Sequence, residues 1–445
     1  MAASTPQILR QGLYFGLAFS VGLMLIAILG AREDRQAIQT VGKDSAPSVI
    51  AAQHIKSALS AMDASAVNQL LAAPGHATQA EKGYQQRREE ASKALIAAAE
   101  NITYGDAERI PIQTIQLALG DYEASFQQAR DYHDSGDPRR DAAYLAAAAK
   151  LDGVLWAAAD ALDKANLDVL ENTYSTRRSV ATLSLGVLIF VGLIQLGVLI
   201  AMQVFLFRTT NRVLNLPLVA CTLLAFAFLI HAEHTFTASM HHLKVAREDA
   251  FTSLHALWRA RAVAYRASAD ESRLLLLRSK AAAFEQDFTG QIDSLAKLPE
   301  GASFEQAANR AIAGKKPREF TGYLADELKN ITFPGEADEA KATLIALRYY
   351  VARDADIGQL EHSGKHQDAI AAVLASRSGQ SKWAFEQFDA ALGRTLDINQ
   401  KAFDAAVKSG FQSLSGFEWM ALATGASLCI LLWLGVWQRL REYQL

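Results

Sequence analysis

Three arginines at regular intervals form the clearest chemical pattern in this sequence. Arg259, Arg266 and Arg273 recur every seven positions, a spacing that places them on one stripe of a helix. Guanidinium groups bind carboxylates in a bidentate manner, so the stripe suits a carboxylate-bearing ligand or an acidic partner surface. A solvated basic face fits the same spacing, and both interpretations stay open. Residues expected on other helices could complete a binding pocket: Tyr265, Arg348, Tyr349, Tyr350 and Trp383.

Histidines gather near the end of one long apolar run. His231, His234, His241 and His242 lie there together with Glu233. A metal or haem site needs ligands at helical spacings, which His234 and His241 provide. The other apolar runs contain no histidine, so a haem held between two membrane helices would lack its second ligand. We therefore interpret these residues as polar groups at a membrane surface, and we predict neither a metal nor a cofactor.

The sequence contains no arrangement typical of catalysis. It has no glycine-rich phosphate loop, no nucleophile beside a base and no metal-binding quartet. The formal net charge of −3 is too small to indicate a nucleic-acid partner. We therefore predict a protein that is not an enzyme and does not bind nucleic acid.

Four apolar runs are long enough to cross a bilayer, and none contains Asp, Glu, Lys or Arg. They are residues 11–31, 179–207, 213–232 and 419–438. The first run is too long for a signal peptide and is followed by charged residues rather than a cleavage site, so we expect an uncleaved anchor. Because 20% of the residues are charged, soluble segments are expected between the runs.

The arginines of the short segments predict the orientation in the membrane. Arg10, Arg208 and Arg441 belong to the segments 1–10, 208–212 and 439–445, which we expect in the cytoplasm together with both termini. Arg177 and Arg178 lie at the other side of their span. The large segments 32–178 and 233–418 would then be extracytoplasmic, in a multi-pass protein of the inner (plasma) membrane.

Periodicity and helix breakers predict four long helices in the first large segment. They cover about Arg32–Leu71, Thr78–Glu100, Ala107–Tyr132 and Arg139–Tyr174, the first and last being continuous with membrane spans. We therefore expect an all-α fold in which each large segment is a four-helix bundle.

The second half of the chain repeats the pattern of the first, which predicts a tandem duplication. Asn101-Ile102-Thr103-Tyr104 is echoed by Asn330-Ile331-Thr332-Phe333, which we interpret as turn and capping residues. The offset is 203 to 204 residues in the early matches and 227 to 229 in the later ones. The second copy thus carries an insertion between Pro299 and Leu328, expected to form a short helix or loop.

The unit of span, helical bundle and span resembles the ligand-binding half of bacterial chemoreceptors and the sensor modules of many sensor kinases. This resemblance rests on the layout and on the stretch from Asp44-Ser45-Ala46-Pro47 to Asp63-Ala64. The tandem layout is also similar to the four-span membrane component that relays amino-acid availability to a cytoplasmic kinase in actinobacteria. The resemblance implies a sensor, with the two copies pairing as a pseudo-dimer within the chain or the chain forming a homo-oligomer. Small residues would let the spans approach closely: Gly12, Gly16, Gly186, Gly192, Gly197, Ala421 and Gly425.

The sequence therefore predicts a lipid-embedded sensor or signal-relay protein. It would detect a small solute, or a solute-loaded periplasmic or extracellular binding protein, and signal to a separate cytoplasmic kinase or regulator. Ligand contacts are expected from Arg259, Arg266, Arg273, Arg348 and Tyr349. The alternative is a scaffold protein of an envelope assembly that has no small-molecule ligand.

Overall fold

The described part of the chain is helical and contains no β-strand. The computed structural model describes residues 5–210, 215–298, 301, 303, 306, 309–310 and 320–442. The α-helices are α1 (Thr5–Gln39), α2 (Ala46–Leu71), α3 (Thr78–Glu100), α4 (Asp106–Asp134), α5 (Arg140–Lys150), α6 (Trp156–Thr210), α7 (Leu216–Lys244), α8 (Thr252–Leu276), α9 (Ala281–Ala296), α11 (Tyr323–Lys329), α12 (Glu336–His362), α13 (His366–Leu374), α14 (Ser381–Ser413) and α15 (Phe417–Glu442). The all-α prediction is confirmed for these residues.

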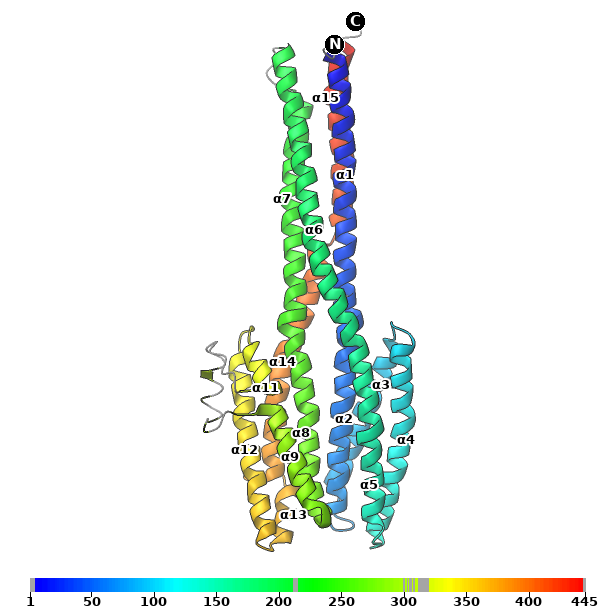
Figure 1. Cartoon of the computed structure of the whole chain (residues 1–445), viewed down its shortest axis with the longest axis vertical. Coiled ribbons are helices and arrows are strands. Elements are labelled where there is room, and N and C mark those ends of the chain that lie inside the picture. The colour runs from blue at the N-terminus through cyan, green and yellow to red at the C-terminus, as the bar shows by residue number, and fades with distance from the viewer. Residues whose placement is uncertain are drawn as a thin grey trace. The chain divides into compact units, whose positions relative to one another are not determined.

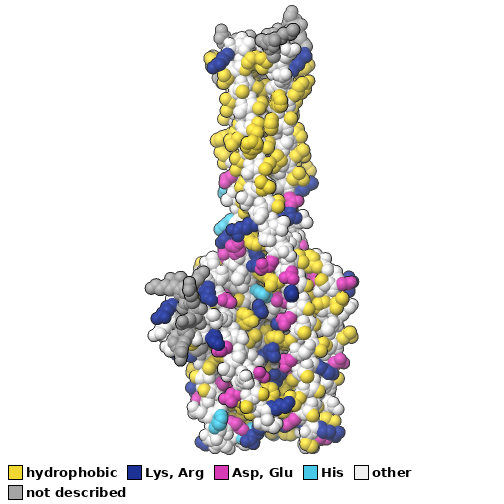
Figure 2. All heavy atoms as spheres, in the orientation of Figure 1, with side chains coloured by type: hydrophobic (Ala, Val, Ile, Leu, Met, Phe, Trp, Pro, Cys, Tyr) yellow, Lys and Arg dark blue, Asp and Glu magenta, His cyan; other side chains and the backbone are white. Residues whose placement is uncertain are grey.

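The contacts divide the chain into two units. Unit 1 comprises Met1–Val41, Glu171–Val245 and Ala405–Leu445, and unit 2 comprises Gly42–Leu170 and Ala246–Asp404. Within the described residues, four helical runs are long and apolar enough to cross a membrane. These runs contain the predicted spans 11–31, 179–207 and 419–438 and residues 216–232 of the remaining one, which fits a multi-pass membrane protein. Figure 2 shows hydrophobic side chains covering the surface of unit 1, whereas charged side chains are scattered over unit 2.

Unit 1 is held together mainly by leucines that its four helices direct inward. Leu13 of α1, Leu199 of α6, Leu218 of α7 and Leu432 of α15 belong to one buried cluster. Polar contacts also cross this interior; for example, the amide of Gln195 donates a hydrogen bond to Ser20 Oγ at 2.7 Å. In an apolar surrounding, such a bond favours one arrangement of the helices, because its partners find no water.

The prediction that small residues let the spans approach closely is right at some positions and wrong at others. A Cβ added at Gly16 would lie 2.8 Å from Leu432, and one added at Gly192 would lie 2.2 Å from Leu229. These glycines therefore permit close helix packing. At Gly186 and Gly197 nothing lies within 4 Å of an added Cβ, because these residues do not face a neighbouring helix of the chain.

Unit 2 is built around the contact between α2 and α8, which lie side by side (Figure 1). The first group of helices contains α2, α3, α4, α5 and the start of α6; the second contains α8, α9, α11, α12, α13 and the start of α14. Helix α2 is buried on all sides, and Ala52, Ile55, Leu59 and Met62 are each 0% exposed. A helix enclosed in this way carries apolar and small residues all round, rather than along one stripe.

Two turns of unit 2 are made by the echoed asparagines. Asn101 Nδ2 donates to Asp44 O at 2.9 Å, and Asn330 Nδ2 donates to Asp249 O at 2.7 Å. Each turn is followed by a carboxylate, Glu108 or Glu336, whose Oε2 accepts two backbone N–H groups of the turn. These bonds satisfy backbone donors of the turn and tie the turn to the helix that follows it.

The helix predictions are close for the first half of the chain and less complete for the second. Helix α3 has the predicted bounds, and α4 differs from its prediction by at most two residues at each end. Three π-helical segments, which the periodicity did not reveal, interrupt the long helices: Thr40–Ser45, Leu151–Leu155 and Val245–Phe251. The Gly314-Lys315-Lys316-Pro317 part of the insertion lies outside the described residues, and α11 follows it.

Candidate functional site

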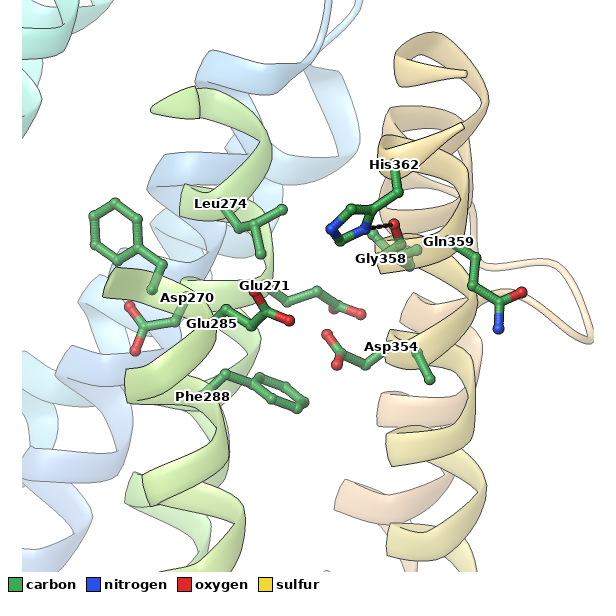
Figure 3. A pocket seen from close by; sticks show the side chains of 12 residues that line it. Asp270, Glu271, Leu274, Glu285, Phe288, Asp354, Gly358, Gln359 and His362 are labelled. Atoms are coloured by element: carbon green, nitrogen blue, oxygen red, sulfur yellow. Dashed lines mark hydrogen bonds between the residues drawn. The ribbon is translucent and has the colours of Figure 1, made fainter. Parts of the chain in front are cut away.

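The second group of helices encloses an acidic cavity of about 280 Å³. Its carboxylates come from three helices: Asp270 and Glu271 from α8, Glu285 from α9 and Asp354 from α12. Figure 3 shows the carboxylates of Glu271 and Asp354 facing each other, with that of Glu285 nearby. Other residues of the wall include Leu274, Phe284, Phe288, Ile357, Gly358 and His362.

Glu271 is the most deeply buried carboxylate of the cavity, at 4% exposed. Ser381 donates a hydrogen bond to its Oε1, and the hydroxyl of Tyr350 donates to its Oε2 at 3.4 Å. Tyr350 is itself held by Phe288 and Phe385, whose rings meet it edge to face. These contacts fix the position of the Glu271 side chain but supply no positive charge to it.

Both facing carboxylates bind protons more tightly than free carboxylates do. Burial raises the pKa of Glu271 to about 8, and the charge of Asp354 acts in the same direction. Burial also raises the pKa of Asp354 to about 7, with a further contribution from Glu285. The physical cause is the cost of placing negative charge in a poorly solvated site beside a second carboxylate.

When they are ionised, Glu271, Glu285 and Asp354 carry negative charge that no ion pair in the described part of the chain compensates. No ion pair joins Glu271, Glu285 or Asp354 to a Lys, Arg or His among the described residues. In the same part of the chain, no group of three or more His, Cys, Asp or Glu residues is placed to hold a metal. The arrangement can therefore take up protons, or it can attract an organic cation large enough to contact several walls.

The predicted arginine stripe is present, but two of its members, Arg266 and Arg273, bind residues of the first group of helices. Arg273 is 5% exposed and binds Asp63 of α2 at 2.5 Å and Asp270 at 2.7 Å. Arg266 pairs with Asp152 at 3.0 Å. The expectation of a solvated basic face is therefore wrong for Arg273, because α2 covers that side of α8.

The remaining predicted site residues are spread over unit 2. Arg259 lies over the ring of Tyr323, Arg348 is exposed, and Tyr349 packs edge to face on Trp383. None of the five predicted residues lines the acidic cavity. Tyr265 was expected on a different helix from the arginines. It instead lies on α8 with them, because α8 is one continuous helix that ends at Leu276.

A second cavity, of about 400 Å³, lies between the two groups of helices within unit 2. Several of its polar side chains already bind one another. Arg261 forms two hydrogen bonds to Asp389, at 2.7 and 2.8 Å, and Arg87 binds the hydroxyl of Tyr265 at 2.7 Å. Since these groups satisfy each other, the acidic cavity is the stronger candidate for a binding site.

Sequence reasoning missed the acidic cavity although one local signal was available. Asp270 and Glu271 are adjacent acidic residues in a stretch of α8 that ends in four consecutive leucines, 274–277. Buried carboxylates in such a stretch are candidates for function. Their partner Asp354 lies 83 positions after Glu271 on another helix, and no sequence pattern links the two.

Comparison with known proteins gives one match, which covers the first group of helices. Residues 37–175 match the family model of the actinobacterial sensor domain. The matched segment runs from the end of α1 through α2, α3, α4 and α5 into α6. No curated protein and no solved structure gave a match. Residues 37–175 are thus similar to a sensor domain, which indicates a sensing role.

Proposed function

We propose that the chain is a transmembrane sensor whose unit 2 lies outside the membrane and detects a solute there. The match of residues 37–175 to a sensor domain carries this proposal. The continuity of the helices supports it, since the runs Thr5–Leu71, Arg140–Thr209 and Leu216–Leu276 each join an apolar segment to unit 2. A change in unit 2 would reach the membrane as a shift, tilt or rotation of such helices.

The proposal includes a tandem repeat, in which the second group of helices is a second copy of the first. The two asparagine turns support this idea, because Asn101 and Asn330 bind a carbonyl of the π-helical segment that precedes α2 or α8. They also contact equivalent serines, Ser48 at 2.7 Å and Ser253 at 3.0 Å. Paired through α2 and α8, the copies would form a pseudo-dimer within one chain.

In this proposal the acidic cavity receives the solute, and a separate cytoplasmic kinase or regulator receives the signal. A cationic solute would favour the ionised forms of Glu271 and Asp354 and balance their charge, and the phenyl rings would cover its apolar parts. A solute-loaded binding protein is the other form in which the solute could arrive. The output protein would contact the cytoplasmic tails and the segment 208–212.

Binding of a solute can be measured as a thermal shift of the full chain in detergent. We expect at least one organic cation from a panel of amino acids, amines and organic acids to raise the melting temperature in a saturable manner. At 100 times Kd, the added stability is about 2.7 kcal/mol. The double variant Glu271→Gln, Asp354→Asn should lose this response.

The matched control removes two exposed carboxylates, Asp134→Asn and Glu386→Gln, and should keep the response. If no member of the panel stabilises the wild-type chain, the scaffold alternative is favoured over the sensor. If the solute still stabilised the Glu271→Gln, Asp354→Asn variant, it would have to bind at another site.

A further inference from the structure

Unit 1 contains a cavity of about 300 Å³ between α1, α6 and α7. Basic residues line it from two helices: Arg177 and Arg178 of α6, and Lys244 of α7. Hydroxyl groups of Tyr174, Thr182 and Thr237 lie in the same wall. Phosphate oxygens are bound in proteins by this combination of cations and hydroxyl donors.

The lining of the cavity contains more basic than acidic side chains. Asp34 is the carboxylate that lines it; Ser239 hydrogen-bonds to Asp34, and burial raises the pKa of that carboxyl to about 6. Arg177 also forms an ion pair with Glu33 of α1, which holds the guanidinium at the cavity wall. Three cations therefore face one carboxylate in the lining.

The cavity opens where the apolar surface of unit 1 ends. Its lining also contains the apolar residues Ala181, Met240 and Leu243. Ile189 lies seven residues after Thr182 on the same face of α6 and is 36% exposed. Ile230 lies seven residues before Thr237 on the same face of α7 and is 55% exposed. Figure 2 shows Lys and Arg side chains at both ends of this apolar surface. A ligand here would therefore meet cations at one end and exposed aliphatic side chains at the other.

We propose that this cavity binds the phosphate headgroup of an anionic glycerophospholipid, whose acyl chains follow Ile189 and Ile230 into the bilayer. The volume fits a glycerol-phosphate headgroup rather than a whole lipid, so the chains stay in the membrane. With unit 2 outside the membrane, as proposed above, this proposal also accounts for Arg177 and Arg178, which would lie at the end of the span where basic residues are usually scarce. It does not depend on the sensor function.

The test uses the full chain in neutral detergent, with lipid binding measured by native mass spectrometry and by thermal shift. We expect phosphatidylglycerol to bind and to stabilise the protein, and phosphatidylcholine to do so much less. Each basic residue near a lipid phosphate contributes about a 5-fold gain in affinity. The double variant Arg178→Gln, Lys244→Gln should therefore bind phosphatidylglycerol roughly 30-fold more weakly.

Two further variants make the result specific. Arg439→Gln with Arg441→Gln removes two cations from the C-terminal end of α15 and should keep full binding, as should the charge-conserving exchange Arg178→Lys, Lys244→Arg. Equal binding of the two lipids, or equal loss in both glutamine variants, would overturn the proposal. If soluble glycerol phosphate stabilised the chain as well as the lipid does, the site would be one for a free phosphate ester instead.

Discussion

Replacing Arg273 with methionine should lower the melting temperature of the full chain by on the order of 10 °C. The guanidinium of Arg273 binds Asp63, Asp270 and the hydroxyl of Tyr144, and its side chain is 6% exposed. Methionine fills most of the space but leaves Asp63, 1% exposed, without its cation. Removing one partner of a buried ion pair costs about 3–5 kcal/mol, because the remaining charge is poorly solvated.

The Arg273→Met substitution should also weaken the contact between the two groups of helices, since Arg273 lies on α8 and Asp63 on α2. Tyr122 and Tyr144 also donate hydrogen bonds to Asp63, at 2.9 and 3.2 Å, so the network spans several helices. Arg273→Lys should lie between the wild type and Arg273→Met, because one ammonium group cannot reproduce the forked geometry of the guanidinium.

The matched control is Arg278→Met, at a position only five residues away. Arg278 is 64% exposed and pairs with Glu361 at 2.9 Å. An exposed pair of this kind contributes roughly 0–1 kcal/mol, so this variant should melt close to the wild type. Thermal unfolding of both variants in the same detergent makes the comparison. Equal melting temperatures for Arg273→Met and Arg278→Met would contradict the structural role assigned to Arg273.

The stability of the chain should fall as the pH rises from about 4 to about 8, in part because of Glu271 and Asp354. Their pKa values in the folded protein are raised to about 8 and about 7, whereas the reference values are 4.5 and 3.8. Between these limits the folded state binds more protons than the unfolded state. The stabilisation is fully present below the unfolded pKa values and is lost as the pH passes through the folded ones.

The unfolding free energy should change with pH by at most about 1.4 kcal/mol per pH unit for each proton taken up on folding. Unfolding free energies measured in detergent between pH 5 and pH 9 would show it. The double variant Glu271→Gln, Asp354→Asn should flatten the curve in this range. Burial also raises the pKa of Glu327 to about 8, so part of the slope should remain until Glu327→Gln is added. An unchanged slope in the double variant would show that the cavity carboxylates are ionised in the folded chain.

Much of the fold follows from signals that are local in the sequence. Charge-free runs locate the membrane segments, because a helix in lipid needs about 20 apolar residues in succession. The bounds of α3 follow from breakers on either side, Pro74-Gly75 before it and Asn101 with Gly105 after it. Such features act within a few residues, so reading them does not require the tertiary structure.

The candidate site could not be obtained in this way, because its residues are joined by distant contacts. The heptad spacing of Arg259, Arg266 and Arg273 shows that they share a face, but it does not show which helix covers that face. The partner of Arg273 is Asp63, 210 positions away. The acidic cavity likewise depends on how α12 packs against α8 and α9, and periodicity says nothing about the register of that packing.

The location of unit 2 outside the membrane is the claim on which the proposed function depends, and labelling with a membrane-impermeant maleimide tests it directly. In a chain lacking Cys221 and Cys429, single cysteines replace the exposed residues Ser135, Ser363 or Thr209. In intact cells we predict labelling at positions 135 and 363, and labelling at 209 only after the membrane is permeabilised. Labelling at 209 in intact cells, with positions 135 and 363 protected, would contradict an extracytoplasmic sensor.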